Sequence, residues 1–182
     1  MRKFSGTGLA ACAILSIGGS WCLAGQAWAQ TPVTIAECTQ NLKGSFTSPL
    51  DPGGTNTPQD EVLTLQGAIN CWDAGGNPFT NGTAKATVTI PAALCTGSEA
   101  GATVVEQITW SDGSTTNFTI DAATAEPVDG VTVIAQSALV SSDSTLFAGA
   151  TATVAGIATG QGCGTQAGES NVDDELTVIF TE

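Results

Sequence analysis

The sequence contains no histidine and no tyrosine, and only four of its 182 residues are Lys or Arg. Because histidine is absent, neither a Ser-His-Asp triad nor a Cys-His catalytic pair can form. Positive charge is scarce, and 17 acidic residues leave a formal net charge of −13. Such a chain repels phosphate backbones and anionic lipid headgroups, so we expect neither nucleic-acid binding nor membrane adsorption.

Two of the four basic residues stand at the very start of the chain. Arg2 and Lys3 precede an apolar run that ends in Ala27-Trp28-Ala29. This order is typical of a secretory signal peptide, and the run is too short and too rich in glycine for a stable membrane span. We therefore predict that residues 1–29 are a signal peptide that is removed on export.

The predicted mature protein, residues 30–182, keeps only Lys43 and Lys85 as basic residues, so its formal charge is 2 − 17 = −15. We expect this charge to keep the secreted, extracellular protein soluble and monomeric. Removal of 29 residues from 182 leaves 153, a length that suits a single domain. A catalytic lysine is not expected, because Lys85 falls on the solvent face of a predicted strand.

Four of the six cysteines lie in the predicted mature protein, and no two of them have the close spacing of a zinc-binding pair. An even number of cysteines in an exported chain predicts two disulfides. If consecutive strands run up and down, Cys38 and Cys71 fall at one end of the domain, and Cys95 and Cys163 fall at the other. This parity favours the pairs Cys38–Cys71 and Cys95–Cys163. No metal or other cofactor is expected.

Apolar and polar residues alternate in short runs between clusters of Gly, Pro, Asn and Asp, whereas helical periodicity is almost absent. The pattern predicts an all-β domain, either a two-layer antiparallel sandwich of the immunoglobulin-like kind or a partly closed barrel of about eight strands. The expected strands are Gly44–Ser48, Glu61–Asn70, Thr83–Ile90, Thr103–Trp110, Thr115–Asp121, Val131–Val140, Ala150–Thr159 and Glu175–Thr181.

Turns and faces follow from the same pattern. Asp112-Gly113 predicts a tight hairpin, because these residue types accept the positive φ angles that such turns need. Longer connections are expected at Ser48–Gln59, Asp73–Gly82 and Gly160–Asp174. Alternation along each strand predicts which side chains face the core. The expected inward residues include Leu63, Leu65, Ile69, Ala84, Ala86, Val88, Ile90, Phe118 and Ile120.

Glu106 is the acidic residue of most interest, because it shares a strand face with Val104 and Ile108. A carboxyl group among apolar neighbours would have a raised pKa, as the general acid of a glycoside hydrolase requires. We expect instead that a bulge or an edge position returns Glu106 to water, since no second acid with matching placement is evident. The run Asp173–Glu175 offers calcium ligands, but we expect a solvated turn there. We therefore predict a protein that is not an enzyme.

Three segments carry a likeness to known proteins: the hairpin Glu106–Thr115, the segment Leu146–Ala150, and the late Cys163, which is followed by a Gly-rich loop and a last apolar strand. In these features the chain resembles a group of small exported β proteins of actinomycetes that have no assigned activity. The resemblance covers about residues 38–182. It implies export and a β-sandwich, and it brings no catalytic residues.

Three functions remain open for such a domain. The leading hypothesis is a non-enzymatic binding module whose loops, chiefly Ser48–Gln59 and Asp73–Gly82, contact an extracellular protein. The second is a carrier of a small apolar ligand, similar to the acidic chromoprotein apoproteins of actinomycetes, which hold an apolar molecule in a β-sandwich cleft. The third is a secreted protease inhibitor with Pro91–Glu99 as its rigid loop. The candidate binding residues are Trp72, Phe79 and Trp110, of which Trp72 and Phe79 would otherwise cap the core.

Overall fold

The computed structural model describes residues 31–95, 99–128 and 131–182. The predicted signal peptide and the cleavage site before Gln30 lie outside the described residues. No helix in the described ranges is long and apolar enough to cross a membrane. The strands are β1 (Thr34–Leu50), β2 (Gln59–Asp73), β3 (Pro78–Ala93), β4 (Glu99–Trp110), β5 (Thr115–Val128), β6 (Val131–Leu139), β7 (Thr151–Gly160) and β8 (Glu169–Thr181).

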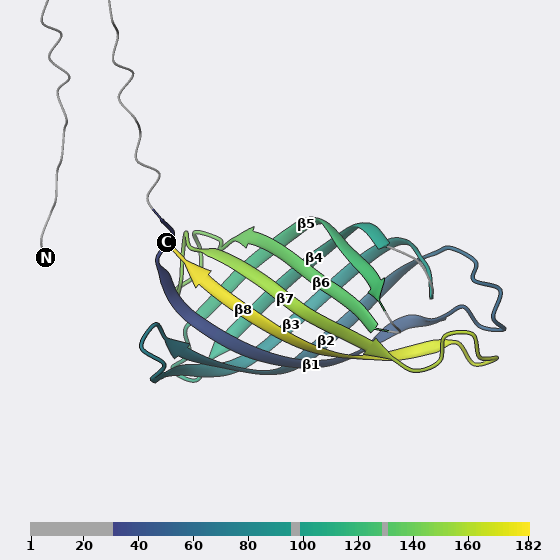
Figure 1. Ribbon diagram of the computed structural model, residues 1–182, viewed down its shortest axis with the longest axis horizontal. Helices are drawn as coiled ribbons and strands as arrows, with labels where there is room; N and C mark the ends of the chain where they lie inside the picture. Colours follow the sequence, from purple (N-terminus) through teal and green to yellow (C-terminus); the bar gives the residue numbers. More distant parts are fainter. Residues whose placement is uncertain (1–30, 96–98, 129–130) are drawn as a thin grey trace, which may run out of the picture. The chain divides into compact units, whose positions relative to one another are not determined.

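The unit Pro32–Glu182 is a closed antiparallel barrel in which each strand pairs with its neighbours in the sequence (Figure 1). The barrel closes because β8 returns to β1, where Thr34 pairs with Thr181 at one end of the ladder. The predicted all-β class and eight strands are confirmed. Of the two predicted architectures the chain forms the barrel and not the immunoglobulin-like sandwich, because closure pairs the edges that β1 and β8 would otherwise expose.

Six of the eight strands extend beyond their predicted limits, most of all β1, which begins at Thr34 and not at Gly44, whereas β6 and β7 lie within one residue of theirs. Strands of this length must coil to wrap around a barrel. At Gly67 on β2 a Cβ atom would lie 1.8 Å from the carbonyl oxygen of Asn41, so only glycine lets the two strands approach this closely. The predicted inward residues of β2, β3 and β5 face the interior. Those that are buried are Leu63, Leu65, Ile69, Ala84, Ala86, Ile90, Phe118 and Ile120, and Val88 packs against them.

Aromatic side chains fill one end of the barrel. The Phe147 ring, from the β6–β7 connection, stacks on the Phe180 ring with centroids 4.1 Å apart, and Trp110 meets Phe147 edge-on at 5.7 Å. The indole N–H of Trp110 donates to Thr116 Oγ1 at 2.8 Å, so it is satisfied inside the core. Phe147 has a φ of 61°, a left-handed conformation that a bulky residue keeps only where packing holds it. We refer to this cluster of Trp110, Phe147 and Phe180 as the aromatic end.

A disulfide lies at each end of the barrel. Cys38 and Cys71 are paired residues of β1 and β2 near the aromatic end, with Cα atoms 4.0 Å apart. At the opposite end Cys95 is bonded to Cys163, with Cα atoms 5.3 Å apart, and this bond joins the β3–β4 connection to the β7–β8 connection. These are the pairs that strand parity favours, because each strand crosses the length of the barrel once.

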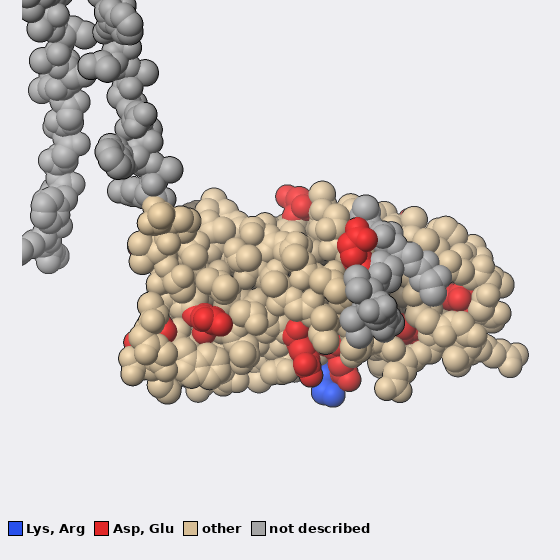
Figure 2. Space-filling model, viewed as in Figure 1, with Lys and Arg blue, Asp and Glu red and all other residues tan. Residues whose placement is uncertain are grey.

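The outer face of the barrel is polar and carries little positive charge. Outward residues of β3, such as Lys85 and Thr87, are exposed. On the face shown in Figure 2, acidic side chains are scattered among uncharged residues and basic atoms occur at one place. Lys43 Nζ lies 3.2 Å from Asp173 Oδ1, but both side chains are largely exposed, so this ion pair adds little stability. Both lysines of the described chain therefore lie outside the barrel.

Candidate ligand-binding site inside the barrel

A cavity of about 440 Å³ occupies the barrel interior between the aromatic end and the end that carries the Cys95–Cys163 disulfide. Its walls are mainly aliphatic, and Phe46 is the only aromatic residue among the described residues that line it. The space exists because several inward positions carry small residues, which leave open the volume that larger side chains would fill. These small residues are Ala86, Ala102, Ala123, Ala125, Ala158 and Gly160.

Glu106 projects from β4 into this cavity and is only 3% exposed. Its Oε1 accepts a hydrogen bond from Gln40 Nε2 on β1 at 2.5 Å, and Gln40 is itself fully buried. The expectation that a bulge or an edge position returns Glu106 to water is wrong. β4 is paired on both sides at this position, with Ala86 of β3 and Phe118 of β5, and the register there is regular.

The environment of Glu106 favours the neutral carboxyl group. The pKa of Glu106 is raised to about 7, mainly by burial, and the negative charge of Asp174 contributes to this increase. The hydrogen bond from Gln40 acts in the opposite direction, because it stabilises the carboxylate. The burial effect dominates, so Glu106 changes its protonation state near neutral pH.

Asp174 is the second buried acid that lines the cavity, and the sequence pattern did not predict it. The expectation of a solvated turn at Asp173–Glu175 is wrong, because these residues lie within β8, where Asp174 pairs with Leu42 and Ala158. Asp174 is 4% exposed and lines the cavity. Burial raises the pKa of Asp174 to about 7, and the neighbouring charge of Asp173 contributes to this increase.

The signal for Asp174 was present in the sequence. Val172, Asp174 and Leu176 alternate with the outward residues Asp173 and Glu175, and all three are buried. The predicted strand began only at Glu175, because the acidic run looked like a turn. Glu106 and Asp174 thus both line the cavity as buried acids, together with the less buried Glu169.

Several buried acceptor atoms in the barrel have no hydrogen-bond donor among the described residues. They are Gln40 Oε1, Gln136 Oε1 and Asp174 Oδ1. A buried polar atom without a partner is unfavourable by about 1–3 kcal/mol, and native proteins seldom keep several close together. Gln136 and Asp174 line the cavity, and Gln40 contacts Glu106, which also lines it. The polar part of the interior therefore offers acceptors to whatever enters it.

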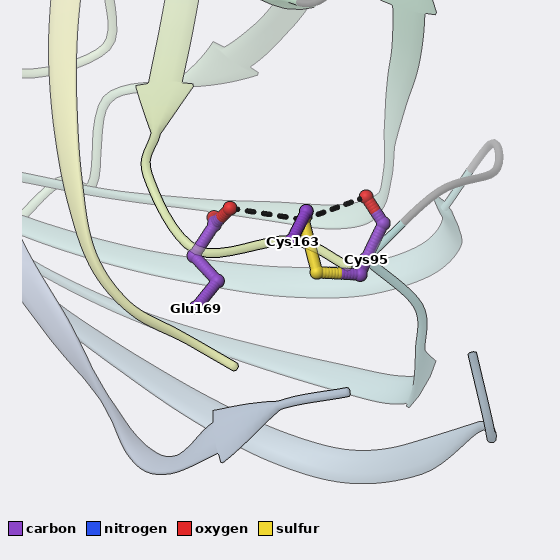
Figure 3. Close-up of side chains that lie close together, drawn as sticks. All are labelled: Cys95, Cys163 and Glu169. Carbon is purple, nitrogen blue, oxygen red and sulfur yellow. Dashed lines mark hydrogen bonds between the residues drawn. A yellow bond between two sulfur atoms is a disulfide. The ribbon is translucent and has the colours of Figure 1, made fainter. Parts of the chain in front are cut away.

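The Cys95–Cys163 disulfide and Glu169 line the cavity at the end opposite the aromatic end. Figure 3 shows the three side chains close together. Cys163 Sγ is 3.0 Å from Glu169 Oε2 and 3.1 Å from the carbonyl oxygen of Cys95. A disulfide sulfur has no proton to donate, so the contact with Glu169 favours the protonated carboxyl group, whose pKa burial raises. The three residues are close enough to share a metal ion, but the disulfide engages both sulfurs.

The barrel wall has its shortest ladder between β5 and β6. In the described residues, four residue pairs join Ala125–Val128 to Val131–Ile134, apart from one isolated bridge near the aromatic end. Every other neighbouring pair of strands has at least eight. Gln136 Nε2 donates to the carbonyl oxygen of Thr124 (2.9 Å) beyond the end of this ladder, and both residues line the cavity. We call this part of the wall the β5–β6 seam.

The predicted binding residues do not form one pocket. Trp110 is 2% exposed and belongs to the aromatic end. Trp72 and Phe79 line a separate surface depression together with Leu146, and Phe79 is 47% exposed. The Phe79 ring also lies 5.9 Å from that of Phe147, so it covers the aromatic end from outside. None of the three predicted residues lines the interior cavity.

One of the predicted long connections is short. The interval Asp73–Gly82 was expected to be a loop, but β2 ends at Asp73 and β3 begins at Pro78. Asp73 Oδ1 accepts hydrogen bonds from the backbone N–H groups of Gly75 and Asn77 at 2.9 Å each, which folds a tight turn between the strands. The other two connections exist but are shorter than predicted, because β1 runs to Leu50 and β8 begins at Glu169, and both lie at the end opposite the aromatic end.

Comparison with known proteins returned no match, either to a family model, to a curated protein or to a solved structure.

Proposed function

We propose that this protein is a secreted, non-enzymatic carrier of a small, largely apolar ligand, which it holds inside the barrel. The observation that supports this most directly is the cavity of about 440 Å³ with aliphatic walls and a few inward polar groups. Sites for small molecules typically enclose 300–1,000 Å³ and combine apolar walls with a small number of polar contacts. The cavity favours a carrier over the binding module that leads among the hypotheses from sequence.

Export of the carrier is supported by two independent features. The first is the predicted signal peptide, residues 1–29, which would direct the chain into an oxidising compartment. The second is the pair of disulfides, Cys38–Cys71 and Cys95–Cys163, which persist in such compartments. The expected resemblance to actinomycete proteins remains a prediction.

The two buried carboxyl groups also suit a glycoside hydrolase in principle, but the walls argue against it. Sugar sites need polar partners for many hydroxyl groups and aromatic surfaces for the ring faces. In this cavity Phe46 is the only aromatic residue among those described, and most of the lining is aliphatic. Glu106 and Asp174 are better suited to fixing one polar group of an otherwise apolar ligand.

The two alternatives from the sequence have weaker structural support. For a protein-binding module, the loop expected at Asp73–Gly82 is only a tight turn, which leaves Ser48–Gln59 as the longer of the two segments. For a protease inhibitor, the expected segment Pro91–Glu99 begins inside β3 and includes residues 96–98, which lie outside the described residues.

Binding of Nile red, a neutral apolar dye, to protein purified from culture fluid tests the proposal. We expect saturable binding with increased fluorescence. Ala86→Phe, which places a ring in the cavity, should weaken binding by about tenfold or more, the effect of losing about 1.4 kcal/mol of contact energy. Thr87→Phe is the matched control, because residue 87 is the outward neighbour on β3. Absent binding, or equal loss in both variants with unchanged melting temperatures, would contradict a site inside the barrel.

A further inference from the structure

We infer that the ligand carries a positively charged amine, which Glu106, Asp174 and Gln40 hold inside the barrel. This inference rests on the proposed function and adds the chemical class of the ligand. It is based on where the polar groups lie, on the kind of hydrogen bond they can still make, and on the sign of the charge that surrounds them.

The three side chains converge from two sides of the barrel. Gln40 pairs with Leu176 across β1 and β8, and Leu42 pairs with Asp174, so Gln40 and Asp174 are diagonal neighbours on the same inward face. Glu106 comes from β4, and the hydrogen bond of 2.5 Å from Gln40 Nε2 spans the interior between them. An amine group near this hydrogen bond would lie within reach of both carboxyl groups.

The free atoms at this place are all acceptors. Gln40 Oε1 and Asp174 Oδ1 have no donor among the described residues, and Gln136 Oε1 on β6 is in the same situation. An ammonium group brings three N–H donors and no acceptor, so it complements this set. A hydroxyl group brings one donor, and a carboxylate brings none and would be repelled.

Charge points to the same class of ligand. The titratable groups that line the cavity are Glu106 on β4 and Asp174 and Glu169 on β8, all of them acidic. The neighbouring Asp173 is acidic too, and its partner Lys43 is exposed on the outer face. No cation of the described chain faces the interior, since Lys85 is also outside. A bound ammonium would supply the missing positive charge to two carboxyl groups that repel each other.

Such binding must depend on pH in a definite direction. In the empty barrel Glu106 and Asp174 both have a pKa of about 7. An ammonium favours their ionised forms, so binding should release protons and should strengthen as pH rises through this range. A neutral alcohol does not favour the ionised carboxyl groups. Its affinity should therefore stay constant or fall as these groups ionise.

Displacement of Nile red by octylamine, octanol and octanoate tests the inference. These probes all carry an eight-carbon alkyl backbone and differ in the head group. At about pH 8 we expect octylamine to bind about tenfold or more tighter than octanol, the ratio that one hydrogen bond to a charged group provides, with octanoate weakest. At about pH 5.5, where both carboxyl groups are mainly protonated, the preference should largely disappear. Asp174→Asn and Glu106→Gln should reduce the preference for octylamine over octanol at the higher pH, whereas Glu175→Gln, at an outward position, should leave this preference unchanged.

Calorimetry on the unaltered protein in buffers of different ionisation enthalpy keeps the test valid even where a variant fails to fold. We expect proton release when octylamine binds near neutral pH and none when octanol binds. Equal affinities for octylamine and octanol at the higher pH, or octylamine binding without proton release, would overturn the amine assignment while a saturable Nile red site leaves the carrier function standing. Failure of Nile red and all three probes to bind would overturn both.

Discussion

Gln40 on β1 donates a hydrogen bond from Nε2 to Oε1 of Glu106 on β4, at 2.5 Å, across the interior of the barrel. Both residues are buried, at 1% and 3% exposure, and they face each other among aliphatic side chains. A polar pair in such a place depends on both of its members, because either one alone is a buried group without a partner.

The pair leads to a prediction about non-additive mutations. Gln40→Leu and Glu106→Leu should each destabilise the barrel by about 1–3 kcal/mol, since each leaves the other group unsatisfied. The double variant should lose less stability than the sum of the two single losses, because it leaves no buried polar group without a partner. Urea denaturation of the four proteins measures the coupling. Strictly additive losses would mean that the hydrogen bond contributes nothing to folding.

The raised pKa values predict that stability falls as pH rises. Folding raises the pKa of Glu106 from 4.5 to about 7, so the folded state binds this proton more tightly than the unfolded state. The resulting stability is complete below about pH 4.5 and is lost as pH rises towards 7. Each pKa unit corresponds to about 1.4 kcal/mol, so Glu106 alone should account for about 3 kcal/mol.

Glu106→Gln should therefore stabilise the protein at about pH 8 and change little at about pH 4, because glutamine still accepts the hydrogen bond from Gln40. Glu175→Gln, at an outward position of β8, serves as the control and should leave the pH profile unaltered. Denaturation curves collected across this range give the answer. A wild-type protein that is more stable at pH 8 than at pH 5 would show that the interior carboxyl groups ionise without cost.

The two disulfides should differ both in reactivity and in their effect on stability. Cys163 is exposed, whereas Cys38 and Cys71 are buried, so a mild reductant should open Cys95–Cys163 first. The bonded cysteines are 68 residues apart in this pair and 33 in the other. Because loop-closure entropy grows by about 0.6 kcal/mol per doubling of length, loss of Cys95–Cys163 should be the more destabilising by about that amount.

Peptide mapping under partial reduction, and denaturation of the two paired Cys→Ser variants, check these expectations. Early reduction of Cys38–Cys71 would mean that the aromatic end opens more readily than the opposite end. A larger loss of stability in the Cys38/Cys71 variant would show that strand pairing, and not loop length, decides the contribution.

The β5–β6 seam should exchange its backbone hydrogens sooner than the rest of the barrel. β5 and β6 share four residue pairs in the described chain, whereas β1 and β8 share a ladder that runs almost the full length of both strands. The amides of Ile120–Thr124 on β5 and of Ala135–Leu139 on β6 that face the seam have no ladder partner across it, so a smaller part of the wall must open for them to exchange. Hydrogen exchange followed by mass spectrometry tests this. Equal protection in peptides from β5–β6 and β1–β8 would contradict a weak seam.

Much of the fold was predictable because alternation along a strand is a local property. Leu63, Leu65 and Ile69 face the interior as their parity requires, and the end at which each cysteine lies follows from counting strands. Whether eight strands form a sandwich or a barrel depends on whether the last strand reaches the first. That is a long-range pairing, Thr34 with Thr181, which no local pattern encodes.

The candidate site was predictable only in part, for a similar reason. The parity of Glu106 was recognised, but an isolated buried acid is unfavourable, so an exposed position was the reasonable expectation. Its partners Gln40 and Asp174 come from strands far away in the sequence, and the cavity depends on small residues of different strands, such as Ala86 and Ala123, lining the same interior. Trp72 and Phe79 attracted attention because aromatic residues often bind ligands, yet here they lie outside the barrel.

The most direct measurement for the account is a titration of the methyl-labelled protein with octylamine, followed by NMR. A ligand inside the barrel should shift the methyl signals of cavity residues such as Leu65, Val104 and Ile134. The methyl signals of Leu146, beside the depression of Trp72 and Phe79, should stay in place. Shifts confined to Leu146 and the outer face, with the cavity signals unchanged at saturation, would contradict the central claim that this barrel carries its ligand inside.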